Sequence, residues 1–154
     1  MSNVDQHSYL LARQAIDALG AEFAWLIDHR SGEGVPELFT EDGVYDMGGE
    51  QVFAGRAEIA HFYTSRKSRG QRTARHVFTN LHVRMESETV ARCVVILTLY
   101  ACDGAPPYPT TALMIADYED VCVRGGDGRW RYRSRTIVPA FGTVPQLAKK
   151  PGTA

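Results

Sequence analysis

The second half of the chain contains four long segments that are rich in β-branched and aromatic residues and are separated by short connections. These strand-like segments are residues 74–85, 90–100, 110–123 and 130–138. Two connections, residues 86–89 and 124–128, are polar or glycine-rich turns, and residues 103–107 contain two prolines that cannot continue a ladder. Long strands joined by such short connections pair as antiparallel neighbours. This half of the sequence therefore predicts an antiparallel meander.

The first half has mainly helical periodicity. Residues 5–28 carry apolar side chains at three- and four-residue steps, which predicts an amphipathic helix ending near His29, with Gly20 allowing a bend or break. A short helix over 35–39, turn residues over 40–43, a hairpin of strands 44–47 and 51–54 and a helix starting at Gly55 follow. We expect an α+β fold in which one curved sheet wraps around the helices and leaves a ligand cavity at its open end.

Composition excludes several classes of partner. The net charge of −1, from 17 basic and 18 acidic residues among 154, provides no field that attracts nucleic acid or an anionic membrane. No apolar run is long enough to span a bilayer, and residues 1–7 lack the pattern of a secretory signal. We expect a single domain over residues 1–140, a tail or flap over 141–154 and a cytoplasmic protein. The basic segment 66–72 is predicted to be a solvated connection, with contact to an acidic substrate as the alternative.

The stretch 74–83 combines reactive and aliphatic side chains in alternation. In an extended strand His76, Phe78, Asn80 and His82 share one face, and Val77, Thr79, Leu81 and Val83 share the other. An imidazole, an aromatic ring and an amide in one row suit a small-molecule pocket. The alternative is that His76 and Asn80 are ordinary hydrogen-bonded residues of the core or surface.

Asp28 lies at the predicted end of the first helix. The helix macrodipole disfavours a carboxylate at this end. Asp28 therefore requires either solvent or a specific partner.

Five local motifs, in this order, resemble the SnoaL-like branch of the NTF2-like superfamily, which includes scytalone dehydratase, bile-acid dehydratase and hexachlorocyclohexane dehydrochlorinase. The motifs are residues 28–30, 38–45, 53–59, 75–80 and 130–135, and the resemblance extends from about residue 5 to residue 140. It implies an NTF2-like, or cystatin-like, cone: N-terminal helices packed in a strongly curved, mixed but mainly antiparallel sheet, with a pocket at the open end.

The resemblance also implies a catalytic pair. In dehydratase-like members an aspartate at the end of the first long helix hydrogen-bonds a histidine on the first meander strand, and that histidine removes a proton from the substrate. The matching positions here are Asp28 and His76. The implied chemistry is elimination by general-base catalysis without a cofactor.

Other candidate site residues have two interpretations each. Tyr45, Trp25, Phe78 and Asn80 are expected to contact substrate, although each could serve in packing or backbone bonding. Arg135 is expected to share one face of the last strand with Arg131 and Arg133, where one arginine could stabilise developing negative charge. If that face meets water, they are solubilising residues. His76, His82 and Asp28 lack the compact spacing of metal ligands, so no metal site is predicted.

The leading hypothesis is a cofactor-independent lyase, a dehydratase or related eliminase, that acts on a hydrophobic cyclic or polyketide-like small molecule. One alternative is an isomerase or cyclase that uses the same pair, and another is a non-catalytic domain that binds a small ligand. Apolar residues assigned to the convex sheet face predict a homo-oligomer, dimer or trimer. These residues are Val77, Thr79, Leu81, Val95 and Leu97.

Overall fold

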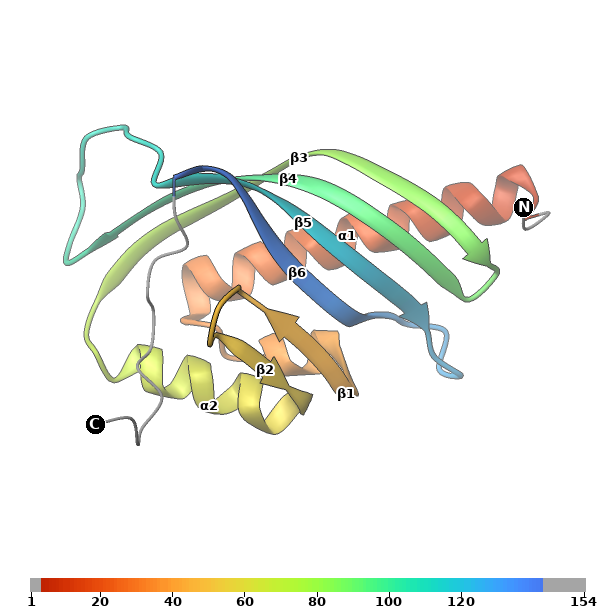
Figure 1. Cartoon of the computed structure of the whole chain (residues 1–154), viewed down its shortest axis with the longest axis horizontal. Helices are drawn as coiled ribbons and strands as arrows, with labels where there is room; N and C mark the ends of the chain where they lie inside the picture. Colours follow the sequence, from red (N-terminus) through yellow and green to blue (C-terminus); the bar gives the residue numbers. More distant parts are fainter. Residues whose placement is uncertain (1–3, 143–154) are drawn as a thin grey trace.

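The computed structural model describes residues 4–142, and the longest helix in it is α1 (Gln6–Arg30), which lies across the inner side of the sheet (Figure 1). Asp5 caps its start, because its carboxylate accepts hydrogen bonds from the backbone N–H groups of His7 and Ser8. The helix ends at Ser31, which adopts a left-handed conformation with φ of 55°. α1 runs without interruption through Gly20, so the break considered at that position does not occur.

A short 3₁₀ helix, a hairpin and a second helix follow α1. The 3₁₀ helix covers Val35–Leu38, β1 covers Phe39–Asp46, β2 covers Val52–Ala54 and α2 covers Gly55–Lys67. Residues 40–43, predicted as a turn, instead belong to β1, where the pairing with the neighbouring strand shifts register between Phe39 and Val44. A Cβ added to Gly43 would lie 2.9 Å from the Phe39 Cβ and 3.0 Å from two backbone oxygens. The irregular strand therefore has no room for a larger residue at this position.

The predicted meander is present. It consists of β3 (Arg72–Ser87), β4 (Val90–Asp103), β5 (Met114–Arg124) and β6 (Trp130–Gly142). The sheet order is β2-β1-β6-β5-β4-β3, with β1 parallel to β6 and all other neighbours antiparallel. Figure 1 shows this curved sheet wrapping around α1, with α2 near one end. The expected α+β fold with a mixed, mainly antiparallel sheet is confirmed. Residues 143–154 of the predicted tail or flap lie outside the described residues.

Aromatic side chains fill the space between α1 and the sheet. Phe23, fully buried on α1, makes edge-to-face contacts with Tyr45 of β1, Tyr118 of β5 and Tyr132 of β6 at centroid distances of 5.8 to 6.3 Å. Such pairs stabilise the core beyond their buried area, by roughly 0.5–1.5 kcal/mol each. Phe23 thereby fixes how α1 lies in the sheet, and with it the position of the helix end that carries Asp28.

A bulge in β3 corrects the predicted alternation of side chains. Asn80 has a φ of 56°, and the pairing of β3 with β4 shifts register between Thr79 and His82. His76 and Phe78 face inward as predicted, but beyond the bulge the inward residues are Leu81 and Val83, whereas Asn80 and His82 are exposed. One extra residue in a strand reverses the faces of all that follow. The predicted row of four side chains is therefore wrong after Phe78.

β6 contains a second irregularity of the same kind. Its pairing with β5 shifts register between Val121 and Cys122, so that Tyr132 and Arg135, three residues apart, are both buried. Arg133 is exposed, and Arg131 is half-buried and paired with Asp127. The expectation that the three arginines share one face is therefore wrong.

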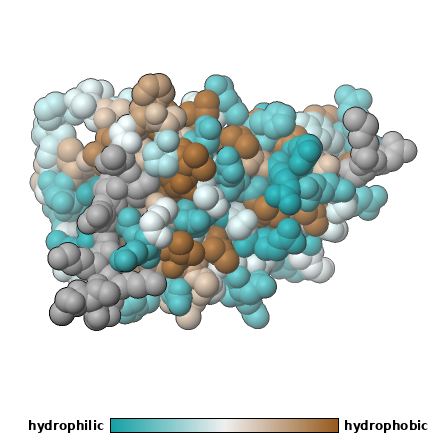
Figure 2. All heavy atoms as spheres, viewed as in Figure 1, coloured by the Kyte–Doolittle hydropathy of each residue, from teal (hydrophilic) through white to brown (hydrophobic). Residues whose placement is uncertain are grey.

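The surface differs from the predicted oligomer interface. Leu81 packs against the core, while Val95 and Leu97 are buried, so these three side chains face inward. Val77 and Val94 remain exposed on the outer face. Figure 2 shows apolar groups interspersed with polar ones across the visible face. The homo-oligomer stays a prediction. Among residues 4–142, no helix is both long and apolar enough to cross a membrane.

Candidate active site

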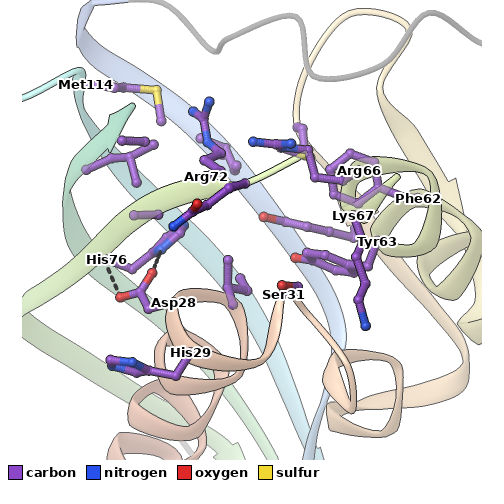
Figure 3. Close-up of a pocket in the computed structure, with 18 of the residues that line it drawn as sticks. Asp28, His29, Ser31, Phe62, Tyr63, Arg66, Lys67, Arg72, His76 and Met114 are labelled. Carbon is purple, nitrogen blue, oxygen red and sulfur yellow. Dashed lines mark hydrogen bonds and ion pairs between the residues drawn. The ribbon is translucent and has the colours of Figure 1, made fainter. Parts of the chain in front are cut away.

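A cavity of about 320 Å³ opens where the end of α1, the last turns of α2 and the start of β3 meet. Figure 3 shows side chains from these three elements around a common space. Its lining combines apolar side chains such as Phe62 and Met114 with the titratable residues described below. The size is within the range of cavities that hold small organic molecules.

Asp28 and His76 form a closely coupled pair in this lining. The His76 Nδ1 lies 2.7 Å from one carboxylate oxygen of Asp28, and the His76 backbone N–H donates to the other at 2.9 Å. Their side chains are 10% and 6% exposed, so water competes little for these bonds. The predicted hydrogen bond between the two residues is confirmed.

The geometry of the pair determines where the imidazole carries its proton. An ionised carboxylate only accepts hydrogen bonds, so the neutral ring must carry its hydrogen on Nδ1. This leaves Nε2 with a free lone pair that is able to accept a proton. Asp28 holds this tautomer and also offers a counter-charge to the imidazolium that proton uptake would create.

Three phenols line the same cavity. They are Tyr45 of β1, Tyr63 of α2 and Tyr118 of β5, and the Tyr45 and Tyr118 oxygens are 3.5 Å apart. Burial raises the pKa of all three phenols, so each remains a neutral O–H donor at physiological pH. The structure thus places Tyr45 at the cavity, as expected for a substrate contact.

Sequence reasoning did not identify Tyr63 and Tyr118 as cavity residues. Tyr63 belongs to an apolar stripe of α2, where packing is the ordinary interpretation of an aromatic side chain. Tyr118 alternates with buried residues of β5 in the same way as a core residue. Only the approach of three separate elements distinguishes these phenols from ordinary core tyrosines.

Basic side chains line the cavity as well. Arg66 and Lys67 come from the last turn of α2, and Arg72 comes from the first residue of β3. The predicted solvated connection therefore contributes three cations to the lining.

Of the five predicted substrate contacts, Tyr45 lines this cavity and the other four, Trp25, Phe78, Asn80 and Arg135, lie outside it. Trp25 is 48% exposed and contacts the His29 ring, one helical turn further along α1. Trp25 lies three residues before Asp28, about 4.5 Å back along the helix axis from the end that borders the cavity. Asn80 is exposed in the β3 bulge. Neither side chain belongs to the cavity lining, so these two expectations are corrected.

Phe78 and Arg135 line a second cavity, of about 430 Å³, between α1 and the sheet. His76 belongs to the linings of both cavities. Arg135 is only 1% exposed and donates two hydrogen bonds of 2.8 Å to Asp120. Burial opposes the charge of Arg135, but the neighbouring Asp120 outweighs it and leaves the pKa of the guanidinium raised.

The Arg135 guanidinium is also surrounded by aromatic rings. The Arg135 Cζ lies 3.9 Å from the centroid of the Tyr132 ring and 4.3 Å from the centroid of the Phe23 ring. Within the described part of the chain, the Arg135 Nη1 and the Tyr132 hydroxyl are buried without a hydrogen-bond partner. Arg135 thus belongs to a buried ion pair in the lining of the second cavity, which His76 also lines, rather than to the lining of the first cavity.

Residues 4–142 contain no group of three or more His, Cys, Asp or Glu side chains arranged to hold a metal ion. The titratable groups that line the first cavity are the Asp28–His76 pair, a second imidazole from His29, three phenols and three basic side chains.

Comparison with known protein families finds a match over most of the chain. Residues 8–136 match the family model described as a SnoaL-like domain. A comparison with curated proteins found no match.

Solved structures resemble the whole fold. Rv3472 of Mycobacterium tuberculosis, of unknown function, shares 23% identity with a TM-score of 0.76, covering 94% of this chain and 80% of that chain. A candidate scytalone dehydratase from Novosphingobium aromaticivorans shares 19% identity with a TM-score of 0.79, covering 97% and 99%. A Nostoc punctiforme protein of unknown function with a cystatin-like fold shares 20% identity with a TM-score of 0.69, covering 84% and 91%. These identities establish the fold alone, and the expected cystatin-like, NTF2-like architecture is confirmed.

Proposed function

We propose that this chain, which belongs to the SnoaL-like domain family, is a cofactor-independent lyase that eliminates water or another small leaving group from a hydrophobic molecule. The single observation that carries the proposal is the 2.7 Å contact between Asp28 and His76 at the wall of a small-molecule cavity. The scytalone dehydratase candidate of the same fold supports a dehydratase-like reaction.

The proposed reaction begins with proton removal by His76. The free Nε2 takes a proton from a carbon next to an activating group, and the C–H electron pair forms the new double bond. The leaving group departs from the neighbouring carbon with its own bonding electrons. Asp28 holds the ring during this step and stabilises the imidazolium, and general-base catalysis of this kind contributes about 10²- to 10⁴-fold in rate.

The buried phenols have a complementary role in this proposal. A departing hydroxide or a substrate carbonyl develops negative charge, and a neutral O–H group stabilises that charge by donating a hydrogen bond. Tyr45 and Tyr63 line the cavity together with His76, and both stay protonated because burial raises their pKa. The proton on His76 returns to solvent or to the departing group, so that the net products are an alkene and the protonated leaving group.

The size and lining of the cavity support a compact hydrophobic substrate. Leu99, Ile137, Met47 and Phe62 contribute apolar wall, and the volume of about 320 Å³ suits a cyclic or polyketide-like molecule. Phe78 and Arg135 line the second cavity together with His76, and the Phe78 ring contacts the His76 ring at a centroid distance of 6.5 Å, so the role proposed for Phe78 is to hold the base in position rather than to bind substrate.

A thermal-shift screen of small metabolites, followed by turnover assays on every hit, tests this function. Wild-type protein is compared with His76→Ala, and products are identified by mass. We expect the variant to retain ligand binding and to lose at least 10²-fold in turnover. A product lighter than the substrate by the leaving group indicates elimination, whereas a product of equal mass indicates an isomerase or cyclase. Ligands bound equally by both proteins without turnover by either would contradict the enzyme and favour a binding domain.

A further inference from the structure

The charged residues of the first cavity are strongly unbalanced. Its lining includes three basic side chains, Arg66, Lys67 and Arg72, and one acidic side chain, Asp28. The Asp28 carboxylate already uses both of its oxygens on His76. The cavity is therefore positive in a protein whose net charge is −1.

Arg66 and Arg72 form the centre of this positive region. Their side chains are 15% and 21% exposed, and both donate to the same oxygen of Asp103, at 3.1 and 2.9 Å. The guanidinium groups are therefore neighbours, and Figure 3 shows both at the same side of the opening. Each guanidinium has five N–H donors, and the bond to Asp103 occupies one nitrogen of each.

Asp103 neutralises this pair only in part. It is 78% exposed, so its carboxylate is largely solvated, and it is not part of the cavity lining. Burial and the charge of Arg72 together lower the pKa of Arg66, which reflects two crowded cations at the edge of an apolar space. A second anion on the cavity side would relieve that crowding and occupy the remaining donors.

The positive pair is separated from the proposed base. Arg72 and His76 are four residues apart on β3, so their Cα atoms are about 13 Å apart along the strand. A molecule that contacts both residues presents its reacting carbon and its charged group at different ends. The intervening wall includes apolar residues such as Ala74 and Leu99.

We propose that the substrate is an amphipathic acid: an apolar body that reacts at His76, with a carboxylate or phosphate bound by Arg66 and Arg72 at the cavity opening. This inference rests on the proposed function, since it names the substrate class of the same site. Arginine is suited to this role because its planar guanidinium binds either a carboxylate or a phosphate through two parallel hydrogen bonds.

A displacement assay tests the inference without a known substrate. The reporter is N-phenyl-1-naphthylamine, a neutral fluorescent probe for apolar cavities. The competitors share one ring system and differ in their end group: 2-naphthoate, 2-naphthyl phosphate and neutral 2-naphthalenemethanol. We expect at least one anion to displace the reporter at a concentration about tenfold lower than the alcohol requires, and the tighter anion identifies carboxylate or phosphate as the preferred group.

The double variant R66Q/R72Q isolates the arginine pair. We expect it to remove the tenfold preference while leaving displacement by the alcohol unchanged. Its matched control is R84Q/R92Q. This variant removes two exposed arginines, Arg84 of β3 and Arg92 of β4, which share the carboxylate of Glu86 outside the cavity. The control should keep the preference. Asp103→Asn, which removes the competing carboxylate, should strengthen anion binding several-fold.

Three outcomes would overturn the inference. The first is equal displacement by anion and alcohol in the wild type, and the second is an anion preference that survives in R66Q/R72Q. The third is that R66Q/R72Q binds all three competitors more weakly by the same factor. Circular dichroism and thermal unfolding of each variant exclude misfolding as the cause. The His76→Ala variant separates this inference from the proposed function. We expect it to keep the anion preference. Loss of that preference in R66Q/R72Q therefore tests the anion site, and loss of turnover in His76→Ala independently tests the proposed function.

Discussion

Asp28 accepts one hydrogen bond on each carboxylate oxygen, and both donors belong to His76. The amide of Asn would replace one acceptor by a donor, so Asp28→Asn either loses one of these bonds or donates to Nδ1 and favours the opposite imidazole tautomer. We predict a loss of turnover of about 10²-fold or more with little change in KM, since the damage concerns the base rather than the apolar wall. Turnover is measured on the substrate found by the screen.

A second measurement of Asp28→Asn needs no substrate. Long-range ¹H–¹⁵N spectra report the imidazole tautomer directly, and we expect the Nδ1–H form of His76 to lose its dominance in the variant. Glu22→Gln, an exposed change on α1, serves as the control. An unchanged tautomer in Asp28→Asn would contradict the orienting role of the carboxylate.

Asp120 and Arg135 form a buried ion pair whose members depend on one another. Asp120→Asn would leave the Arg135 charge, at 1% exposure, without its counter-ion. We predict that the free energy of unfolding falls by about 3–5 kcal/mol, measured by urea denaturation at pH 7.

The matched control is Asp127→Asn, because Asp127 also binds an arginine of β6 through both oxygens but lies at the surface. Exposed pairs contribute little to stability. Equal effects of the two substitutions would show that burial does not set the strength of the Asp120–Arg135 pair.

At the scale of single elements, irregular strands decide which side chains reach the interior. Simple alternation describes β3 up to Phe78 and β6 up to Tyr132, and in both strands a bulge then moves the next inward position by one residue. Leu81 and Arg135 face inward for this reason. Such bulges bend the strands and so allow the sheet to curve strongly.

The irregular start of β1 provides a stability prediction at this scale. Gly43→Ala would place a Cβ 2.9 Å from the Phe39 Cβ and 3.0 Å from the backbone oxygens of Thr40 and Tyr132. Backbone atoms cannot move away cheaply, so we predict a loss of about 1–3 kcal/mol in the free energy of unfolding.

Gly126→Ala is the control for this substitution, because nothing lies within 4 Å of a Cβ at that position. Its effect should remain within about 0.5 kcal/mol. No loss of stability for Gly43→Ala in the same urea titration would contradict the predicted steric conflict at this position.

At the scale of the whole molecule, the core buries four phenols, and burial disfavours their ionised form. Burial raises the pKa of Tyr45, Tyr63, Tyr118 and Tyr132 above 10, the value for an exposed phenol. Above about pH 10 the unfolded chain therefore releases protons that the folded protein retains, and unfolding becomes easier as pH rises. Below pH 10 both states hold these protons, so the full stability is present there.

We predict that the urea midpoint is constant between pH 8 and 9.5 and falls steeply above pH 10. Absorbance at 295 nm should show the four phenols ionising only with unfolding, as monitored by circular dichroism. Ionisation of all seven tyrosines near pH 10 in the folded protein would contradict the burial of the core phenols.

Local sequence is sufficient to predict the elements and their broad arrangement. Apolar periodicity, turn residues and strand composition depend on near neighbours, so α1, α2 and the four-strand meander are predictable to within a few residues, whereas the residues at the irregular start of β1 predict a turn. The resemblance to SnoaL-like proteins added the pairing of Asp28 with His76, which no local pattern contains.

Tertiary structure alone decided which side chains share a cavity. The bulges at Asn80 and beside Arg133 depend on the register between separate strands, so alternation assigned the wrong faces to Arg133 and His82. Tyr63, Tyr118 and Arg72 line the first cavity because α1, α2, β3 and β5 converge at one end of the sheet. Contacts between distant segments set that convergence, and local sequence carries no signal of them.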